Sequence, residues 1–143
     1  MNRNHSNRRQ RIDRPRVIGT LAERAALIGC ASRVLDAMAK SGQFDENDLR
    51  SLDSVILGFL REPEPRLLGF CSYAHNHRTA SNAGERTWRI LVKRSLIHVQ
   101  DGELAATLYH EFLHGILGYD EGHGALFQQY EGLWGAIERG VTS

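Results

Sequence analysis

The strongest constraint in this sequence is a helical segment that is apolar almost all round and yet leads into three ionisable residues. Residues 104–109, Leu-Ala-Ala-Thr-Leu-Tyr, place apolar side chains on nearly every face of a helix, so the helix should be buried. His110, Glu111 and His114 follow directly. Burying ionisable side chains without partners is costly, so the fold must supply something that compensates for them.

The limits of this helix can also be predicted. Asp101 suits the N-cap position and Glu103 the first turn, where the helix dipole favours a negative charge. Gly115, Gly118 and Gly122 indicate a break after the ionisable residues. Glycine allows the sharp turn that would bring the chain back over the helix.

Residues 110–114 form an H-E-x-x-H pattern. Its two histidines are four residues apart and share a helix face, so both imidazoles can reach one metal ion. Glu111 lies about 100° round the helix from His110, where it can contact a water at the metal instead of the metal itself. Zinc lowers the pKa of such a water to about 7, and the carboxylate can take its proton during attack on a carbonyl. The other interpretation is a pair of core histidines with Glu111 as their internal partner.

A catalytic zinc needs a third protein ligand and one open position. His123, beyond the glycines, is the best candidate. Asp120, Glu121 and Glu131 compete with it, and Glu131 would correspond to the thermolysin arrangement, in which the following helix provides a glutamate. The metzincin extension does not fit, because Leu117 and Asp120 stand where it requires Gly and His.

The sequence pattern in the first half of the chain predicts a long helix. Thr20 and Glu23 have the spacing of a capping box, and Ser41-Gly42 ends the pattern. Apolar residues recur every three or four positions, giving one stripe that should face the core. The stripe consists of Leu21, Ala25, Ile28, Ala31, Leu35 and Met38.

The rest of the chain predicts a small α+β fold. Residues 54–60, 66–75 and 87–93 read as short strands, and a closing helix runs over about 124–139. The length of 143 residues suits one domain with a modest core. We therefore expect an N-terminal helix, a three-stranded sheet, the buried H-E-x-x-H helix and a C-terminal helix, all within residues 17–143.

The first 16 residues have a different composition and predict a flexible arm. A segment of like charge with almost no apolar residues cannot fold by itself. Such an arm either contacts nucleic acid through phosphate groups or only improves solubility. Its basic residues are Arg3, Arg8, Arg9, Arg11, Arg14 and Arg16, against the single acid Asp13.

Composition also bears on the compartment. No apolar run reaches the length of a membrane span, and the basic amino terminus lacks the apolar region of a secretory signal. Cys30 and Cys71 fit two buried thiols in a reducing environment. We expect a cytoplasmic protein, monomeric and without membrane contact.

Other residues have weaker claims to a site. His75 and His77 would share one face of a strand and could bind a second metal. His98 is either a core histidine or reaches the cleft. Tyr119 and Tyr130 are either packing residues or donors to a developing oxyanion.

The ordered set of motifs resembles the SprT-like zinc metalloproteases, the group that includes Spartan. His123-Gly124-Ala125-Leu126-Phe127 after H-E-x-x-H is similar to the H-G-x-x-F signature of that family. Residues 68–73, Leu-Gly-Phe-Cys-Ser-Tyr, are similar to its G-x-C-x-Y strand, and residues 88–92 correspond to the next strand. The resemblance covers about residues 45–135.

The resemblance implies a minimal zincin-like metalloprotease with one catalytic Zn²⁺. His110, His114 and His123 would be the zinc ligands and Glu111 the general base. The substrate would be an extended or unfolded protein, and in Spartan-type members it is a protein crosslinked to DNA. Proteases of this build bind peptides along a sheet edge, here expected near residues 87–93. Many members carry a cysteine-based zinc ribbon after the protease core; this chain ends at Ser143 without such cysteines, so DNA contact would fall to the arginine-rich arm.

Two alternatives remain open. The chain could be a non-proteolytic, zinc-stabilised module that binds nucleic acid through its arm, or it could hydrolyse a small molecule in a closed pocket. Glu111 favours an enzyme, because a structural zinc site normally fills its fourth position with protein and has no use for a base. Histidine ligation also suits other divalent transition metals.

Overall fold

The computed structural model describes residues 18–61, 67–75, 86–99, 102–118 and 120–142. The arginine-rich arm predicted over residues 1–16 lies outside them, so the division of the chain into an arm and a domain stays a prediction. The elements are α2 (Leu21–Ser41), α3 (Glu46–Arg50), β1 (Ile56–Phe59), β2 (Gly69–His75), β3 (Arg86–Val92), the 3₁₀ turn η1 (Arg94–His98), α4 (Glu103–Leu117), α5 (Ala125–Glu131) and α6 (Trp134–Thr142). The predicted α+β architecture is confirmed.

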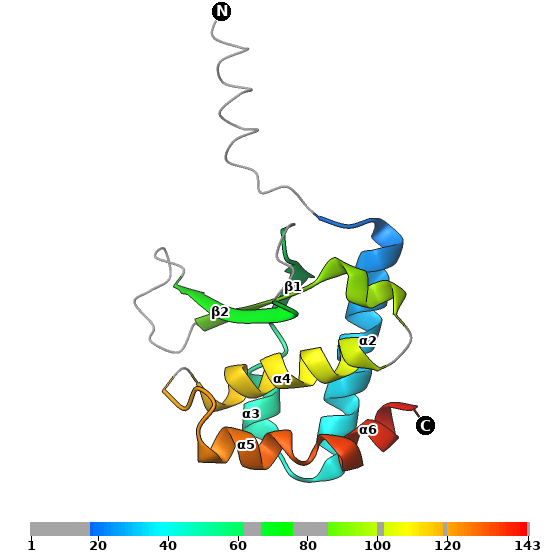
Figure 1. Cartoon of the computed structure of the whole chain (residues 1–143). Coiled ribbons are helices and arrows are strands. Elements are labelled where there is room, and N and C mark those ends of the chain that lie inside the picture. Colours follow the sequence, from blue (N-terminus) through cyan, green and yellow to red (C-terminus); the bar gives the residue numbers. More distant parts are fainter. Residues whose placement is uncertain (1–17, 62–66, 76–85, 100–101, 119, 143) are drawn as a thin grey trace, which may run out of the picture.

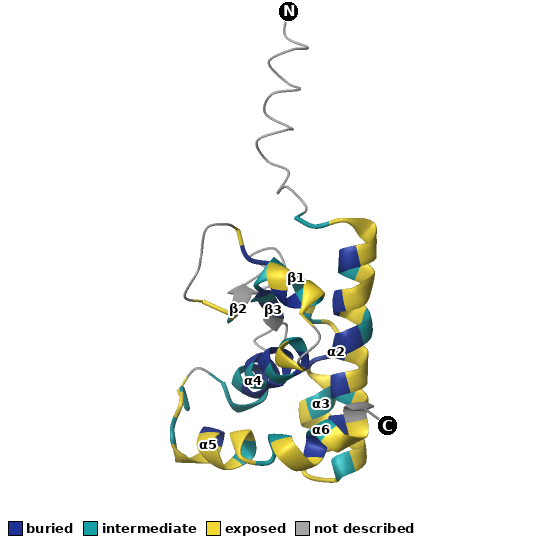
Figure 2. Ribbon diagram, turned by 45° about the vertical axis from the view of Figure 1, so that its right-hand side comes forward, coloured by how far each residue is buried: buried dark blue, intermediate teal, exposed yellow. Residues whose placement is uncertain are grey.

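Helix α4 lies at the centre of the fold (Figure 1). Strands β2 and β3 pack on one side of it, α5 and α6 lie on the other, and α2 also contacts it. Leu108, Phe112 and Leu113 of α4 are completely buried. Figure 2 shows α4 as mostly buried, whereas α2 alternates between buried and exposed residues. The prediction that the H-E-x-x-H helix is buried is confirmed.

The sheet has the strand order β1-β3-β2, with β1 parallel and β2 antiparallel to β3. The expectation of an exposed edge near residues 87–93 is wrong, because β3 pairs on both sides. Its Ile90, for example, lies opposite Leu57 of β1 and Cys71 of β2. Strands β1 and β2 are the edges, and β2 is the edge strand that packs on α4.

Helix α2 begins and ends as predicted, but only Ala31 and Met38 of the predicted stripe are part of its buried face. The Thr20 side chain accepts from the Glu23 N–H while the Glu23 carboxylate accepts from the Thr20 N–H, which completes the capping box. Gly42 ends the helix at φ 72°, a conformation that favours glycine. Leu21 and Ile28 of the predicted stripe are 78% and 57% exposed. The buried face consists of Glu23, Leu27, Cys30, Ala31, Val34, Ala37 and Met38.

An ion pair between buried Glu23 and the partly exposed Arg94 explains this difference. Glu23 is only 7% exposed, and its carboxylate accepts from Arg94 Nε at 3.0 Å and from Arg94 Nη2 at 2.8 Å. His98 Nε2 lies 2.9 Å from the same carboxylate. The hydrogen bonds from Arg94, the Thr20 backbone and His98 hold the pKa of Glu23 far below its usual value. The start of α2 is thereby tied to η1, and the face that carries Glu23 turns inward.

Two predictions about the second half of the chain are wrong. The closing segment forms two helices, because α5 ends at Glu131 and α6 begins at Trp134. Gly115 does not break α4 but lies inside it, where an added Cβ would come within 3.0 Å of the Leu52 side chain. The N-cap of α4 is Gly102, at φ 81°, while Asp101 lies outside the described residues.

Within the described residues, no helix is both long and apolar enough to cross a membrane. Cys30 and Cys71 are both buried, as the sequence predicted.

The Glu23 ion pair predicts a pH-dependent stability. Because folding lowers the pKa of this carboxyl group, its contribution is complete above the unfolded pKa of about 4.5 and is lost as the pH falls toward the folded value. Glu23→Gln should lower the melting temperature by several degrees at pH 7 and by progressively less below pH 4.5. Thermal unfolding from pH 7 to pH 3 measures this. Glu46→Gln, which removes an exposed pair with Arg50, should have almost no effect; a pH-independent loss in Glu23→Gln would contradict the prediction.

Candidate metal centre

The histidines of α4 lie on one face of the helix, turned toward α5. His110 and His114 are one helical turn apart, and their ring centroids are separated by 4.9 Å. This is the arrangement that spacing of i and i+4 requires. Both side chains are half-buried, so they reach the surface of the fold while the residues beside them remain in the core.

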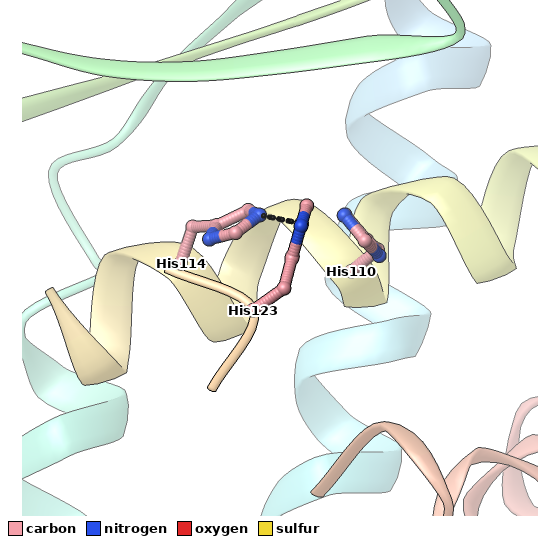
Figure 3. Close-up of side chains that lie close together, drawn as sticks. All are labelled: His110, His114 and His123. Atoms are coloured by element: carbon pink, nitrogen blue, oxygen red, sulfur yellow. Dashed lines mark hydrogen bonds between the residues drawn. The ribbon is translucent and has the colours of Figure 1, made fainter. Parts of the chain in front are cut away.

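The chain after α4 brings a third histidine to the same place (Figure 3). Gly118 at φ 83° and Gly122 at φ 53° have positive φ values, which favour glycine, and the chain turns back here. His123 Nε2 then lies 3.1 Å from His114 Nε2. One ligand atom from each of His110, His114 and His123 lies within 4.8 Å of the others. The structure therefore brings together the three residues predicted as ligands.

This donor set fits a divalent transition metal. Zinc–nitrogen bonds of about 2.0–2.1 Å in tetrahedral geometry place ligand nitrogens about 3.3 Å apart, close to the His114–His123 separation. Burial, together with the neighbouring His110 and His123, lowers the pKa of His114 to about 4. His114 is thus neutral at physiological pH, which is the form that binds a metal. Three imidazoles accommodate zinc and other divalent metals alike, so the geometry indicates a metal site without identifying the ion.

Phe127 of α5 forms the base of the histidine cluster. Its ring centroid lies 4.9 Å from that of His110, 4.6 Å from that of His114 and 5.0 Å from that of His123. Phe127 is 2% exposed. A buried ring in contact with all three imidazoles restricts their rotation and excludes water from one side of the cluster.

Glu111 lies outside the histidine group and faces the sheet. It is buried, and an added Cβ on Gly69 of β2 would come within 2.9 Å of Glu111 Oε2. Burial raises the pKa of Glu111 to about 7, with an opposing contribution from His110 and a further increase from Glu131. Glu111 is therefore next to the site, poorly solvated and able to exchange a proton near neutral pH.

The residues that compete with His123 for the position of third ligand make other contacts or face solvent. Glu121 Oε2 accepts from the backbone N–H groups of Leu126 at 3.2 Å and Phe127 at 3.4 Å, so it caps the start of α5. Glu131 Oε1 contacts Nδ1 of His110 at 3.0 Å. Asp120 is exposed. Among the described residues, only the three histidines form a group with metal-ligand spacing.

The weaker candidates do not join this site. His98 contacts Glu23, in the first turn of α2. The Tyr130 ring stacks on Phe44 at 5.3 Å, which supports a packing role. Tyr119 and His77 lie outside the described residues, as does the side chain of His75.

Sequence reasoning missed three contributions to the site. These are the base formed by Phe127, the contact of Glu131 with the outer nitrogen of His110, and the close approach of Gly69 to Glu111. The sequence does indicate that residues 127 and 131 act on the same side of α5, because they are four apart and so share a helix face. Nothing in the local sequence indicates which face of α4 that pair contacts.

None of the family models, curated proteins or solved structures compared with this chain matches it.

His123→Ala should weaken zinc binding about a hundredfold, because it removes one ligand out of a set that together provides roughly 10–16 kcal/mol in small zinc sites. Competition with a chromophoric chelator measures the dissociation constant. Asp120→Ala, three residues earlier and exposed, is the matched control and should bind zinc as the wild type does. The reverse result would assign the third ligand to Asp120.

Gly69→Ala should lower the free energy of unfolding by about 1–3 kcal/mol, as overpacking does elsewhere. The added Cβ would come within 2.8 Å of Thr107 Cγ2 as well as close to Glu111. Urea unfolding at pH 7 measures the change. Gly135→Ala is the control, since an added Cβ there meets no atom within 4 Å; equal stability of the two variants would show that β2 has room to move.

Proposed function

We propose that this protein is a zinc-dependent endopeptidase of the zincin type, with His110, His114 and His123 as ligands and Glu111 as the general base. The observation that carries the proposal is the convergence of three histidines beside a buried carboxylate that is not part of their group. A purely structural zinc site has no use for such a carboxylate.

The residues present support hydrolysis as the reaction class. Zinc held by the three histidines would supply a Lewis acid that polarises a carbonyl group and acidifies water. Glu111 takes a proton from the attacking water while the water oxygen bonds to the carbonyl carbon. The proton then passes to the amide nitrogen as the C–N bond breaks, which yields a carboxylic acid and an amine. The raised pKa of Glu111, about 7, suits a group that must both accept and donate this proton.

The position of β2 supports an extended peptide as the substrate. Strand β2 pairs with β3 along one edge, and its other edge pairs with no strand of the described residues. An added Cβ on Gly69 of this strand would come within 2.9 Å of Glu111 Oε2. A peptide added to that edge would gain backbone hydrogen bonds beside the general base. His123 is exposed, and such an open site suits a polymer better than a small molecule, which would need a closed pocket.

The proposal includes the SprT-like family and a role near DNA. The H-E-x-x-H and H-G-x-x-F patterns and the strand containing Cys71 support that family. The six arginines of residues 1–16 support contact with DNA, and proteins crosslinked to DNA are the corresponding substrate class. The cytoplasmic location and the monomeric state remain part of this proposal.

Cleavage of an unfolded protein tests the activity. Wild type loaded with one equivalent of zinc should cleave denatured casein, and Glu111→Gln should cleave it roughly 10²–10⁴-fold more slowly, because the general base is lost. Mass spectrometry identifies the products. Glu111→Gln should still bind zinc and fold, since the substitution removes a carboxylate that burial disfavours.

Two further arms of the same experiment separate the alternatives. Single-stranded DNA should stimulate the wild type, and a variant with glutamine at the six arginines of the arm should lose that stimulation. Zinc bound one-to-one without cleavage under any condition would rule out the protease and favour the nucleic-acid-binding module. Equal rates for wild type and Glu111→Gln would show that the cleavage comes from a contaminant.

A further inference from the structure

A carboxylate contacts one ring nitrogen of a histidine in the metal site. Glu131 Oε1 lies 3.0 Å from Nδ1 of His110. An ionised carboxylate only accepts hydrogen bonds, so Nδ1 carries a proton in this contact, and in the neutral imidazole Nε2 then keeps its lone pair. We propose that Glu131 is a positioning residue, which holds His110 in the tautomer and the ring orientation that present Nε2 to the metal. The inference rests on the metal site of the proposed function.

Helix α5 is built to supply this contact. Phe127 and Glu131 are four residues apart on α5, and His110 and His114 are four apart on α4. The two pairs face each other, because the Phe127 ring contacts both histidines and Glu131 contacts His110. The same face of α5 therefore provides an apolar base for the rings and a charged partner for one outer nitrogen.

A neighbouring hydrogen bond fixes the register of the two helices. Tyr109, which precedes His110, donates from Oη to the backbone carbonyl of Tyr130, which precedes Glu131, at 2.5 Å. Tyr109 is 1% exposed and stacks on Trp134 with a centroid distance of 4.8 Å. Consecutive residues of α4 thus bind consecutive residues of α5. The end of α5 is held by a core residue, so Glu131 is in place without a metal.

The contact has a known physical consequence for metal sites. A carboxylate that accepts from the outer N–H of a ligand histidine orients the ring and increases its basicity, and loss of such a partner lowers metal affinity 10–100-fold. The side chain of Glu131 is 44% exposed, and water weakens a contact of this kind. We therefore expect an effect at the lower end of that range, about tenfold.

Three variants test the assignment. Glu131→Ala removes the acceptor, and Glu131→Gln keeps an acceptor oxygen but removes the charge. Glu46→Ala is the matched control, because it makes the same charge change at an exposed position on α3. Three quantities are measured: the tautomer of His110 in the metal-free protein at pH 8, by ¹⁵N NMR of the imidazole nitrogens; the zinc dissociation constant, by chelator competition; and the melting temperature of the metal-free protein.

The wild type and Glu46→Ala should show His110 protonated at Nδ1 and should bind zinc equally. Glu131→Ala should show a mixture of the two tautomers and about tenfold weaker zinc binding, with an unchanged melting temperature of the metal-free protein. Glu131→Gln should keep Nδ1 protonated and recover part of the affinity. A merely structural role for Glu131 would change the melting temperature and leave the tautomer as it is.

The same measurements show how the inference would fail. An Nδ1-protonated His110 in Glu131→Ala, or unchanged zinc affinity, would overturn the role of Glu131 while leaving the metal site intact. Absence of zinc binding by the wild type would refute the metal site and the inference together. The two failures are therefore distinguishable.

Discussion

The burial of α4 on all sides determines which of its side chains can take part in chemistry. One face, containing Thr107, Glu111 and Gly115, packs against the sheet and the residues beside it. A second face carries His110 and His114 toward α5. The remaining faces of α4 carry apolar side chains that belong to the core. Consecutive residues of a helix point about 100° apart. Glu111, the candidate base, is therefore enclosed under β2, whereas the histidines reach the surface.

Most of the local structure could be predicted from the sequence, because it depends on neighbours along the chain. The capping box at Thr20 and Glu23, the glycine end at Gly42 and the i, i+4 spacing of His110 and His114 need no tertiary information. The three strands could also be predicted, with ends that differ by at most three residues from the observed ones. The third ligand could be proposed only because the glycines before it indicate a turn.

The failures concern partners that are far apart in the sequence. The buried face of α2 carries Glu23, which counts as polar in any hydrophobic pattern, and its partner Arg94 lies 71 residues away. The central place of β3 follows from parallel pairing with β1, which residues between them do not reveal. Glu131, one of the competing third ligands, likewise has a contact that depends on a distant partner. Sequence spacing placed it within reach of the metal, but the register of α5 on α4 directs it to Nδ1 of His110.

The third histidine has a different attachment from the other two, and this has a mechanical consequence. His110 and His114 belong to a rigid core helix, whereas His123 belongs to the turn that leads from α4 to α5. An ion held by all three would act as a reversible cross-link between the core and that turn. It would close only the short segment 115–122, so the gain from reduced chain entropy is small. Its larger effect would be to hold α5, and with it Phe127, against α4. Binding of the ion and packing of this helix pair would then stabilise each other.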